Sequence, residues 1–181
     1  MKTNLSLLLA VAVALGCTGT QDDAVVVSAG ADFDTAIETL ATSSDLADVN
    51  ASLGILYGGG VPAIEALREH LSDDRVIPAV HTTRLANGTA TVGDQAFWTI
   101  QEMIEPFLFK SYSGNYSVLT REGAEQWLDS HRGMTIVGLQ IEATSTALTH
   151  AKRDLEMTGS PEARMAIEIC RERLTELRRS R

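Results

Sequence analysis

The sequence predicts a mainly α-helical protein, folded as a helical bundle or as layered helical hairpins. Apolar residues recur every three or four positions through most of residues 32–181, which is the pattern of a helix with one buried face. Glycine and proline interrupt this pattern at short turns, where one helix would end and the next begin. A stretch of this length suits one unit, so we expect a single helical domain over residues 32–181.

The first expected elements are a helix at the start of this domain and a helical hairpin over residues 45–72. Asp32 or Asp34 can cap the first helix, whose apolar stripe begins at Phe33. The hairpin turns at residues 58–60, which are all glycine, and a proline two residues later opens its second helix. No Lys-Ser/Thr pair follows the glycines, so we interpret them as a turn and not as a phosphate-binding loop.

The second helix of this hairpin begins with the stretch Gly60–Leu67, which reads GVPAIEAL. The hairpin is similar to a unit of HEAT-type helical repeats over roughly 30 residues, and no second copy follows at the period of about 40 residues that an array needs. The resemblance implies antiparallel helices packed in layers. It implies no catalytic or binding residue.

The helical pattern lapses over residues 73–91, where we expect a loop or a short β-hairpin near residues 80–92. An Asn-Gly pair at positions 87–88 lies between two segments rich in β-branched residues, and this pattern favours a tight hairpin turn. Long loops in compact domains often carry function, so the acidic, basic and histidine side chains of this stretch are candidate binding residues. These candidates are Asp73, Asp74, His81 and Arg84.

A well-defined helix is expected over residues 92–105. Thr91 can cap it, and Asp94 stands three residues later in the position that completes a capping box. Glu102 and Glu105 lie on one face, three residues apart. We interpret them as a solvated acidic face and not as an acid–base pair, since no aromatic cleft accompanies them.

The polar segment 111–117 contains two tyrosines in a Ser/Gly/Asn setting, which is typical of adaptable contact surfaces. Tyr112 and Tyr116 are therefore candidate binding residues, with the alternative that their rings seal the core. A short helix follows and ends near His131. A cation suits the C-terminal end of a helix, so we interpret His131 in that way and not as a metal ligand.

The last expected element is a helical hairpin over residues 135–180. Residues 134–141 have the composition of a strand or of a helix, and a continuous apolar stripe favours a helix over Thr135–Met157. Gly159 would end this helix, Ser160 would cap the next one and Pro161 would be its first residue. Cys170 lies on the inward stripe of the second helix, where a thiol behaves as a small hydrophobic group.

No arrangement in the sequence supports catalysis, a metal site or a cofactor. The four histidines stand far apart, without the spacing of metal ligands, and no Gly-x-Ser-x-Gly motif is present. The formal charge is −9, which disfavours binding to nucleic acid because phosphate backbones need clustered Lys and Arg. We therefore expect no catalytic residue, no cofactor and no nucleic-acid partner.

The first sixteen residues have the layout of a signal peptide, with Lys2 before an apolar run that ends in small residues. The run is about 11 residues long, and a bilayer-spanning helix needs about 20. The sequence Ala-Leu-Gly-Cys at 14–17 resembles the lipobox of bacterial lipoprotein precursors, although Ala14 replaces the commonest leucine and Leu15 a small residue. This resemblance implies cleavage between Gly16 and Cys17 and acylation of the Cys17 thiol.

Residues 17–31 would then form a lipidated cysteine and a tether that reaches up to roughly 45 Å. Its valine run, Val25–Val27, belongs to a mobile tether or to a strand that docks on the domain. Ordinary secretion and a structural Cys17 are the competing interpretations of the leader. Without acylation, a disulfide of Cys17 becomes an alternative to a free, buried Cys170.

These observations favour a membrane-anchored lipoprotein of the bacterial cell envelope that acts as a non-enzymatic, helical protein-interaction module. It would contact the lipid bilayer through acylated Cys17 and bind a protein partner, with the periplasmic face of the outer membrane as one location. A structural or assembly subunit that oligomerises through the C-terminal hairpin is one alternative. A small-ligand sensor or enzyme with a site near residues 73–87 is the other.

Overall fold

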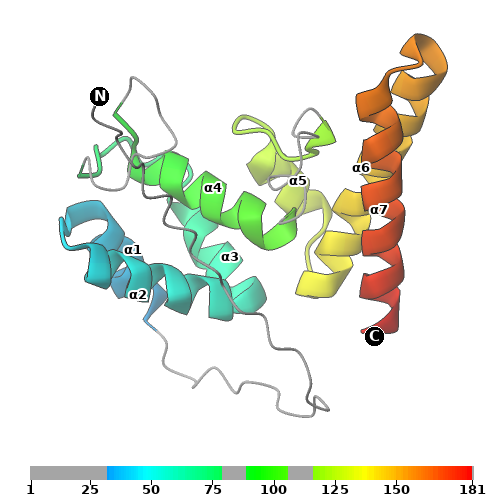
Figure 1. The fold of residues 1–181 in the computed structure, drawn as a ribbon. Helices are drawn as coiled ribbons and strands as arrows, with labels where there is room; N and C mark the ends of the chain where they lie inside the picture. The colour runs from blue at the N-terminus through cyan, green and yellow to red at the C-terminus, as the bar shows by residue number, and fades with distance from the viewer. Residues whose placement is uncertain (1–31, 79–88, 106–115, 181) are drawn as a thin grey trace, which may run out of the picture.

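The computed structural model describes residues 32–78, 89–105 and 116–180 of the chain. Seven helices contain 74% of these residues, and no strand occurs among them, so the predicted mainly α-helical fold class is confirmed. The first helices lie at one end of the molecule and the last two stand side by side at the other (Figure 1).

Four helices form the N-terminal part of the fold: α1 (Phe33–Thr42), α2 (Leu46–Gly58), α3 (Gly60–Glu69) and α4 (Val92–Ile104). Helix α1 packs against α2 and α3, and α4 contacts all three. Side-chain oxygens of Asp32, Asp45 and Thr91 cap α1, α2 and α4 by accepting backbone N–H groups. Thr91 and Asp94 form the complete capping box that the sequence predicts.

Helices α2 and α3 meet at Gly59 with almost no connecting loop. A Cβ atom added to Gly59 would lie 2.5 Å from Cε1 of Phe33 and 2.6 Å from Cβ of Ala63, so only glycine fits here without a shift. Gly60 continues the turn with a φ of 59°, which glycine adopts without strain. The first turn of α1 therefore lies directly beside the end of α2.

The stretch between α3 and α4 contains one isolated antiparallel bridge, between Val76 and Thr91. The backbone N–H of Ile77 donates to the carbonyl of Ala90 (3.0 Å), and the N–H of Gly93 donates to the carbonyl of Asp73 (2.9 Å). Of the described residues of the predicted 80–92 hairpin, Thr91 thus pairs with Val76, which precedes that hairpin, and no strand pair forms among the described residues. The Asn-Gly turn lies outside the described residues.

Three helices complete the fold: α5 (Ala124–Ser130), α6 (Ile136–Thr158) and α7 (Pro161–Arg179). Thr135 caps α6, which confirms that residues 136–141 are helical and not a strand. Gly159 stops α6 with a φ of 67°, and Ser160 caps α7 with Pro161 as its first residue. The two long helices pack along each other as an antiparallel hairpin (Figure 1).

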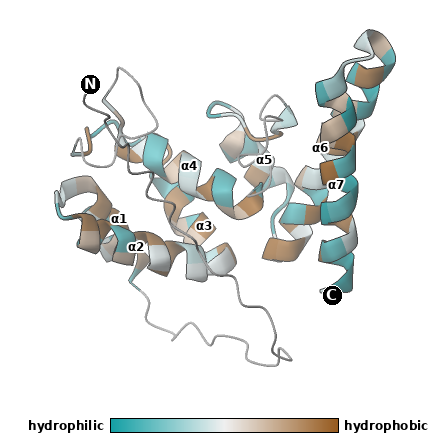
Figure 2. Ribbon diagram, in the orientation of Figure 1, coloured by the Kyte–Doolittle hydropathy of each residue, from teal (hydrophilic) through white to brown (hydrophobic). Residues whose placement is uncertain are grey.

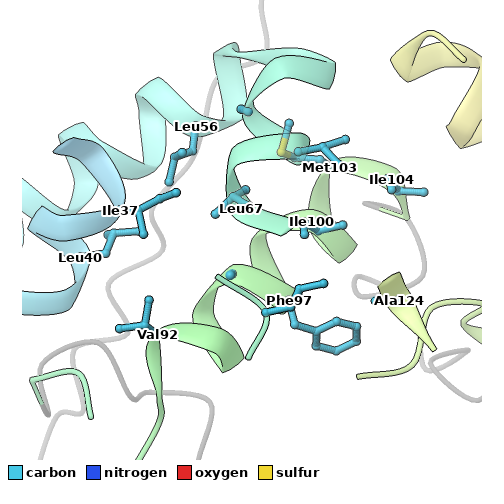
Figure 3. Close-up of a cluster of buried hydrophobic side chains, with 14 of the residues drawn as sticks. Ile37, Leu40, Leu56, Leu67, Val92, Phe97, Ile100, Met103, Ile104 and Ala124 are labelled. Atoms are coloured by element: carbon cyan, nitrogen blue, oxygen red, sulfur yellow. The ribbon is translucent and has the colours of Figure 1, made fainter. Parts of the chain in front are cut away.

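The main hydrophobic core lies among α1 to α5 and the start of α6. Ile37 of α1, Leu56 of α2 and Leu67 of α3 point toward α4, which contributes Ile100 and Ile104 (Figure 3). Each of these five side chains is at most 1% exposed. Their burial joins the N-terminal helices into one packed unit, since each buried aliphatic side chain stabilises by about 1.5–3 kcal/mol.

A second, smaller core lies in the α6–α7 hairpin and consists mostly of alanine. Small side chains let the two helices approach closely over their length. Cys170 is buried in this core, as predicted. Tyr116, from the segment before α5, packs against the same core.

Hydrophobic and hydrophilic residues are interspersed along α6 and α7, which are the two longest of the described helices (Figure 2). This pattern suits helices that bury one side against each other and expose the other. Within residues 32–78, 89–105 and 116–180, none of the helices has the length and apolar character needed to cross a bilayer.

Candidate functional site

A surface groove beside α1 and α3 carries most of the acidic side chains of the N-terminal helices. It consists of two adjoining hollows of 570 and 370 Å³, which share Asp32, Asp34 and Glu69 in their lining. Phe33 and Ala66 add an apolar part to the smaller hollow. Five carboxylates line the groove: Asp32, Asp34, Glu38, Glu65 and Glu69.

Asp32 is held in place because it caps α1. Its carboxylate accepts hydrogen bonds from the Thr35 hydroxyl (2.5 Å) and the Thr35 backbone N–H (2.9 Å). The hydroxyl bond is the larger cause of a lowered pKa of the Asp32 carboxyl, with the backbone bond next. This side of the groove therefore keeps its negative charge down to low pH.

The other carboxylates of the groove come in pairs with helical spacing. Asp34 and Glu38 are four residues apart on α1, and Glu65 and Glu69 are four residues apart on α3. Like charges at this spacing destabilise a helix by about 0.2–0.5 kcal/mol per pair. A cationic group bound in the groove would relieve this repulsion.

Arg75 contacts one carboxylate of the groove, that of Glu38. Its guanidinium bonds to Glu38 at 2.9 Å and to Asp73 at 2.9 Å, and His70 Nδ1 lies 3.5 Å from the same Asp73 carboxylate. The hydrogen bonds from the Arg75 side chain lower the pKa of Asp73 to about 2. Asp73 is thus an anchor between α1, α3 and the segment before α4.

Arg68 lies beside another carboxylate of the groove, that of Glu65. Its side chain is 13% exposed and bonds to Asp129 of α5 at 2.5 Å, with Glu65 3.6 Å away. The pair joins α3 to α5 across 61 positions of sequence. Glu65 and Glu38 thus have arginine neighbours, and the exposed Asp34 and Glu69 line both hollows of the groove.

The structure separates the predicted site residues. Asp73 is half-buried in the contacts described above, and Asp74 beside it is exposed. His81, Arg84 and Tyr112 lie outside the described residues. The groove residues of α1 and α3 escaped the sequence analysis because α1 and α3 are about 30 positions apart, and only tertiary packing brings them together.

Tyr116 is not an exposed contact residue, and that interpretation is wrong. The side chain is 8% exposed and its ring packs into the alanine-rich core of the α6–α7 hairpin. Its hydroxyl donates a hydrogen bond to the carboxylate of Asp154 on α6, which also raises the pKa of the Tyr116 hydroxyl. The alternative interpretation, a tyrosine ring that seals the core, is the correct one.

The burial of Glu105 differs most clearly from what the sequence predicts. It was expected on a solvated face, yet it is fully buried at the end of α4. Its carboxylate accepts the backbone N–H of Val118 (2.7 Å) and the hydroxyl of Ser117 (2.5 Å), and Gln101 donates to Ser117 (2.8 Å). Burial raises the pKa of Glu105 despite these bonds.

The thiol of Cys170 is also buried, and it interacts electrostatically with Glu105. Burial raises its pKa to about 11, and the charge of Glu105 acts in the same direction. The thiol is therefore protonated at neutral pH and unsuited to nucleophilic attack. Glu105 and Cys170 serve packing and hydrogen bonding in this geometry.

The described residues contain no group of three or more His, Cys, Asp or Glu side chains arranged to hold a metal ion. His131 lies at the end of α5, where its ring stacks on Trp127 with centroids 4.1 Å apart. The chemistry that the groove offers is a concentrated negative charge over a partly apolar lining.

No protein-family model, curated protein or solved structure matches the chain.

Proposed function

We propose that the protein is a membrane-anchored lipoprotein of the bacterial cell envelope whose helical domain binds another protein without catalysing a reaction. The leader and the Ala-Leu-Gly-Cys sequence at 14–17 support export and acylation of Cys17. With residues 1–16 removed, 14 basic and 24 acidic residues remain, a formal charge of −10. The acyl chains would then make the membrane contact, since an acidic body is not attracted to anionic lipid.

The acidic groove between α1 and α3 is the observation that carries the protein-binding part of this proposal. Its carboxylates favour a basic protein segment, and the apolar contribution of Phe33 and Ala66 suits an aliphatic or aromatic side chain of that segment. Complementary charge of this kind speeds association and selects partners. Asp34 and Glu69 are the residues we expect to contact the partner most directly.

The test is affinity purification from native membranes with a groove variant. Asp34→Asn with Glu69→Gln removes two exposed charges and spares the cap and the two arginine contacts. Glu162→Gln with Glu168→Gln, both exposed on α7, is a control with the same change of charge. A partner that co-purifies with the control and is lost with the groove variant supports the proposal; equal recovery with both variants contradicts it.

A structural or assembly subunit is the second candidate, and one observation favours it. Met157 and Met165, near the α6–α7 turn, are 68% and 40% exposed. Exposed methionines suit adaptable contacts with another chain. Size-exclusion chromatography at high protein concentration distinguishes the two candidate functions, because a chain that stays monomeric does not self-assemble through this hairpin.

A ligand site around Asp73 has less support. Its carboxylate is already held by Arg75, with His70 beside it, and would have to exchange these contacts for a ligand.

A further inference from the structure

The C-terminal end of α7 carries arginines that the fold does not neutralise. Arg171, Arg178 and Arg179 are exposed, and none of them forms an ion pair with another described residue. Cations are favourable in the last turn of a helix, where they complement its dipole, but this effect fades within one turn. The dipole therefore accounts for Arg178 and Arg179 and leaves Arg171, two turns earlier, without a role in the helix.

These arginines share one side of α7. Positions 171 and 178 are two helical turns apart, about 10 Å along the axis. An open hollow of 370 Å³ runs along the same side, and its lining consists of Arg171, Glu172, Thr175, Glu176 and Arg179. The carboxylate of Glu176 is already bonded to Arg173 at 3.0 Å. With five arginines and two glutamates in residues 171–181, this end of the chain has an excess of positive charge.

The N-terminal helices carry the opposite charge. Residues 32–105 contain twelve Asp or Glu residues and three Arg residues. In the acidic groove between α1 and α3, Asp34 and Glu69 are exposed and form no ion pair with any residue that the structure describes. Phe33 and Ala66 add apolar lining, on which the methylene stem of an arginine can lie. The groove therefore offers carboxylates for a guanidinium and an apolar surface for its stem.

We propose that the end of α7 in one copy of the chain docks in the acidic groove of a second copy, with its exposed arginines facing Asp34 and Glu69. This inference rests on the proposed function, because it names the partner of the same groove. Helices α1 and α7 lie at opposite ends of the molecule, so the two surfaces meet only between copies (Figure 1). A guanidinium pairs with a carboxylate through two parallel hydrogen bonds, which adds direction to the attraction of charge.

A second copy suits the groove because every chain carries both surfaces. Other arginines of the fold have partners within it: Arg68 with Asp129, Arg75 with Asp73, and Arg121 with Asp94. The arginines at the end of α7 and the two exposed acids of the groove lack such partners among the described residues, and they are opposite in sign. Complementary charge of this kind steers association and fixes the orientation of the two partners.

The contact would be head to tail. Each copy would use its groove for one neighbour and the end of α7 for the other, which produces an open row or a closed ring. One groove and the last turns of one helix bury less than the roughly 800 Å² per partner of a stable interface, so we expect rapid exchange in solution. Anchoring through Cys17, as proposed above, would hold the copies in one plane and raise their effective concentration.

The first test uses the chain from residue 17 onward with Cys17→Ser, which retains all described residues and does not depend on export or acylation. Sedimentation velocity measures its average mass as the protein concentration rises at low salt. We expect this mass to increase with concentration and to return to that of the monomer in about 1 M salt, where the screening length is about 3 Å. A chain that stays monomeric at low salt up to about 1 mM would overturn the inference.

The second test reverses the charges at the end of α7. Arg178→Glu with Arg179→Glu should lower the association constant at least about tenfold, because like charges would then face each other. Lys152→Glu with Arg153→Glu, both exposed on α6, changes the net charge by the same amount and should leave association unchanged. Equal losses in the two variants would assign the effect to net charge and overturn the docking of α7.

The third test is rescue by a complementary variant. Asp34→Lys with Glu69→Lys should also abolish association, and a mixture of this groove variant with the arginine variant should associate again, because each reversed surface meets one of opposite charge. Rescue requires both variants to be folded. A mixture that stays monomeric, although circular dichroism shows both variants to be helical, would contradict the inference.

Failure of this inference differs from failure of the proposed function. A chain that stays monomeric, and whose groove variant loses a different protein in the affinity purification, would exclude the second copy as partner and still support a protein-binding groove. Self-association that survives the arginine substitutions would also contradict docking of α7.

Discussion

The hydroxyl of Ser117 donates a hydrogen bond to the carboxylate of Glu105 at 2.5 Å, across 12 positions of sequence. The same carboxylate accepts the backbone N–H of Val118, so the end of α4 is tied to the segment that leads into α5. Tyr116, next to Ser117, packs into the core of the α6–α7 hairpin. One buried carboxylate thus links segments that pack into both hydrophobic cores of the described residues.

Replacement of Glu105 by alanine should destabilise the fold by about 1–3 kcal/mol, because the Ser117 hydroxyl and the Val118 N–H lose their buried acceptor. Urea unfolding followed by circular dichroism measures this change. Ala substitution at Glu142, a half-exposed residue of α6, is the control and should cost much less.

The raised pKa of Glu105 also predicts a pH dependence. The unfolded carboxyl ionises near its ordinary pKa of 4.5, while the buried one still holds its proton. Stability should therefore fall as pH rises from about 4.5 through the raised pKa. Glu105→Gln should flatten this slope above pH 4.5, and an unchanged slope would contradict the burial of an ionisable Glu105.

Tyr116→Phe removes the hydroxyl that donates to Asp154 and should cost about 1 kcal/mol of unfolding free energy. Asp154→Asn keeps an acceptor oxygen and should cost less than Asp154→Ala. A double-mutant cycle between Tyr116→Phe and Asp154→Ala isolates the pair, with a coupling of about 0.5–1.5 kcal/mol expected. Additive losses would mean that the hydroxyl does not contact Asp154 in solution.

Asp73 should stabilise the fold only above strongly acidic pH. Arg75 holds its pKa at about 2, below the ordinary 3.8, so this stabilisation is complete above pH 4 and is lost as pH falls toward 2. Arg75 is about half exposed, so the effect should stay below about 1 kcal/mol. The stability of Asp73→Asn, compared with the unsubstituted chain at pH 5 and pH 3, should show the larger deficit at pH 5.

The thiol of Cys170 should resist modification in the native protein, since it is buried and its pKa is raised to about 11. In the Cys17→Ser chain at pH 8, we expect iodoacetamide to label Cys170 only in the unfolded fraction of the protein. The labelling rate should rise with urea in parallel with the unfolding equilibrium. Complete labelling within minutes in the absence of urea would place Cys170 at the surface.

Local features of the sequence predicted the helices well. The caps at Asp32 and Thr91, the turn at residues 58–60 and the stop at Gly159 each depend on neighbours within four positions, so the sequence contains them directly. The inward position of Cys170 followed from helical periodicity for the same reason.

Features made by distant contacts were predicted poorly. Glu105 was read as solvated because its spacing from Glu102 suggested one polar face, and its partners come from the segment after the next loop. Tyr116 finds its acceptor 38 positions away, and the acidic groove joins residues of α1 and α3. Such contacts depend on how helices pack, which periodicity alone does not specify.

The most direct test of the account is the mass of the N-terminal peptide of the protein isolated from its own cells. We predict a chain that begins at Cys17, carries acyl groups on that cysteine and partitions with the membrane fraction, and a Cys17→Ser chain that leaves that fraction while its helices stay folded. A chain that still begins at Met1 and is recovered from the soluble cell interior would contradict it.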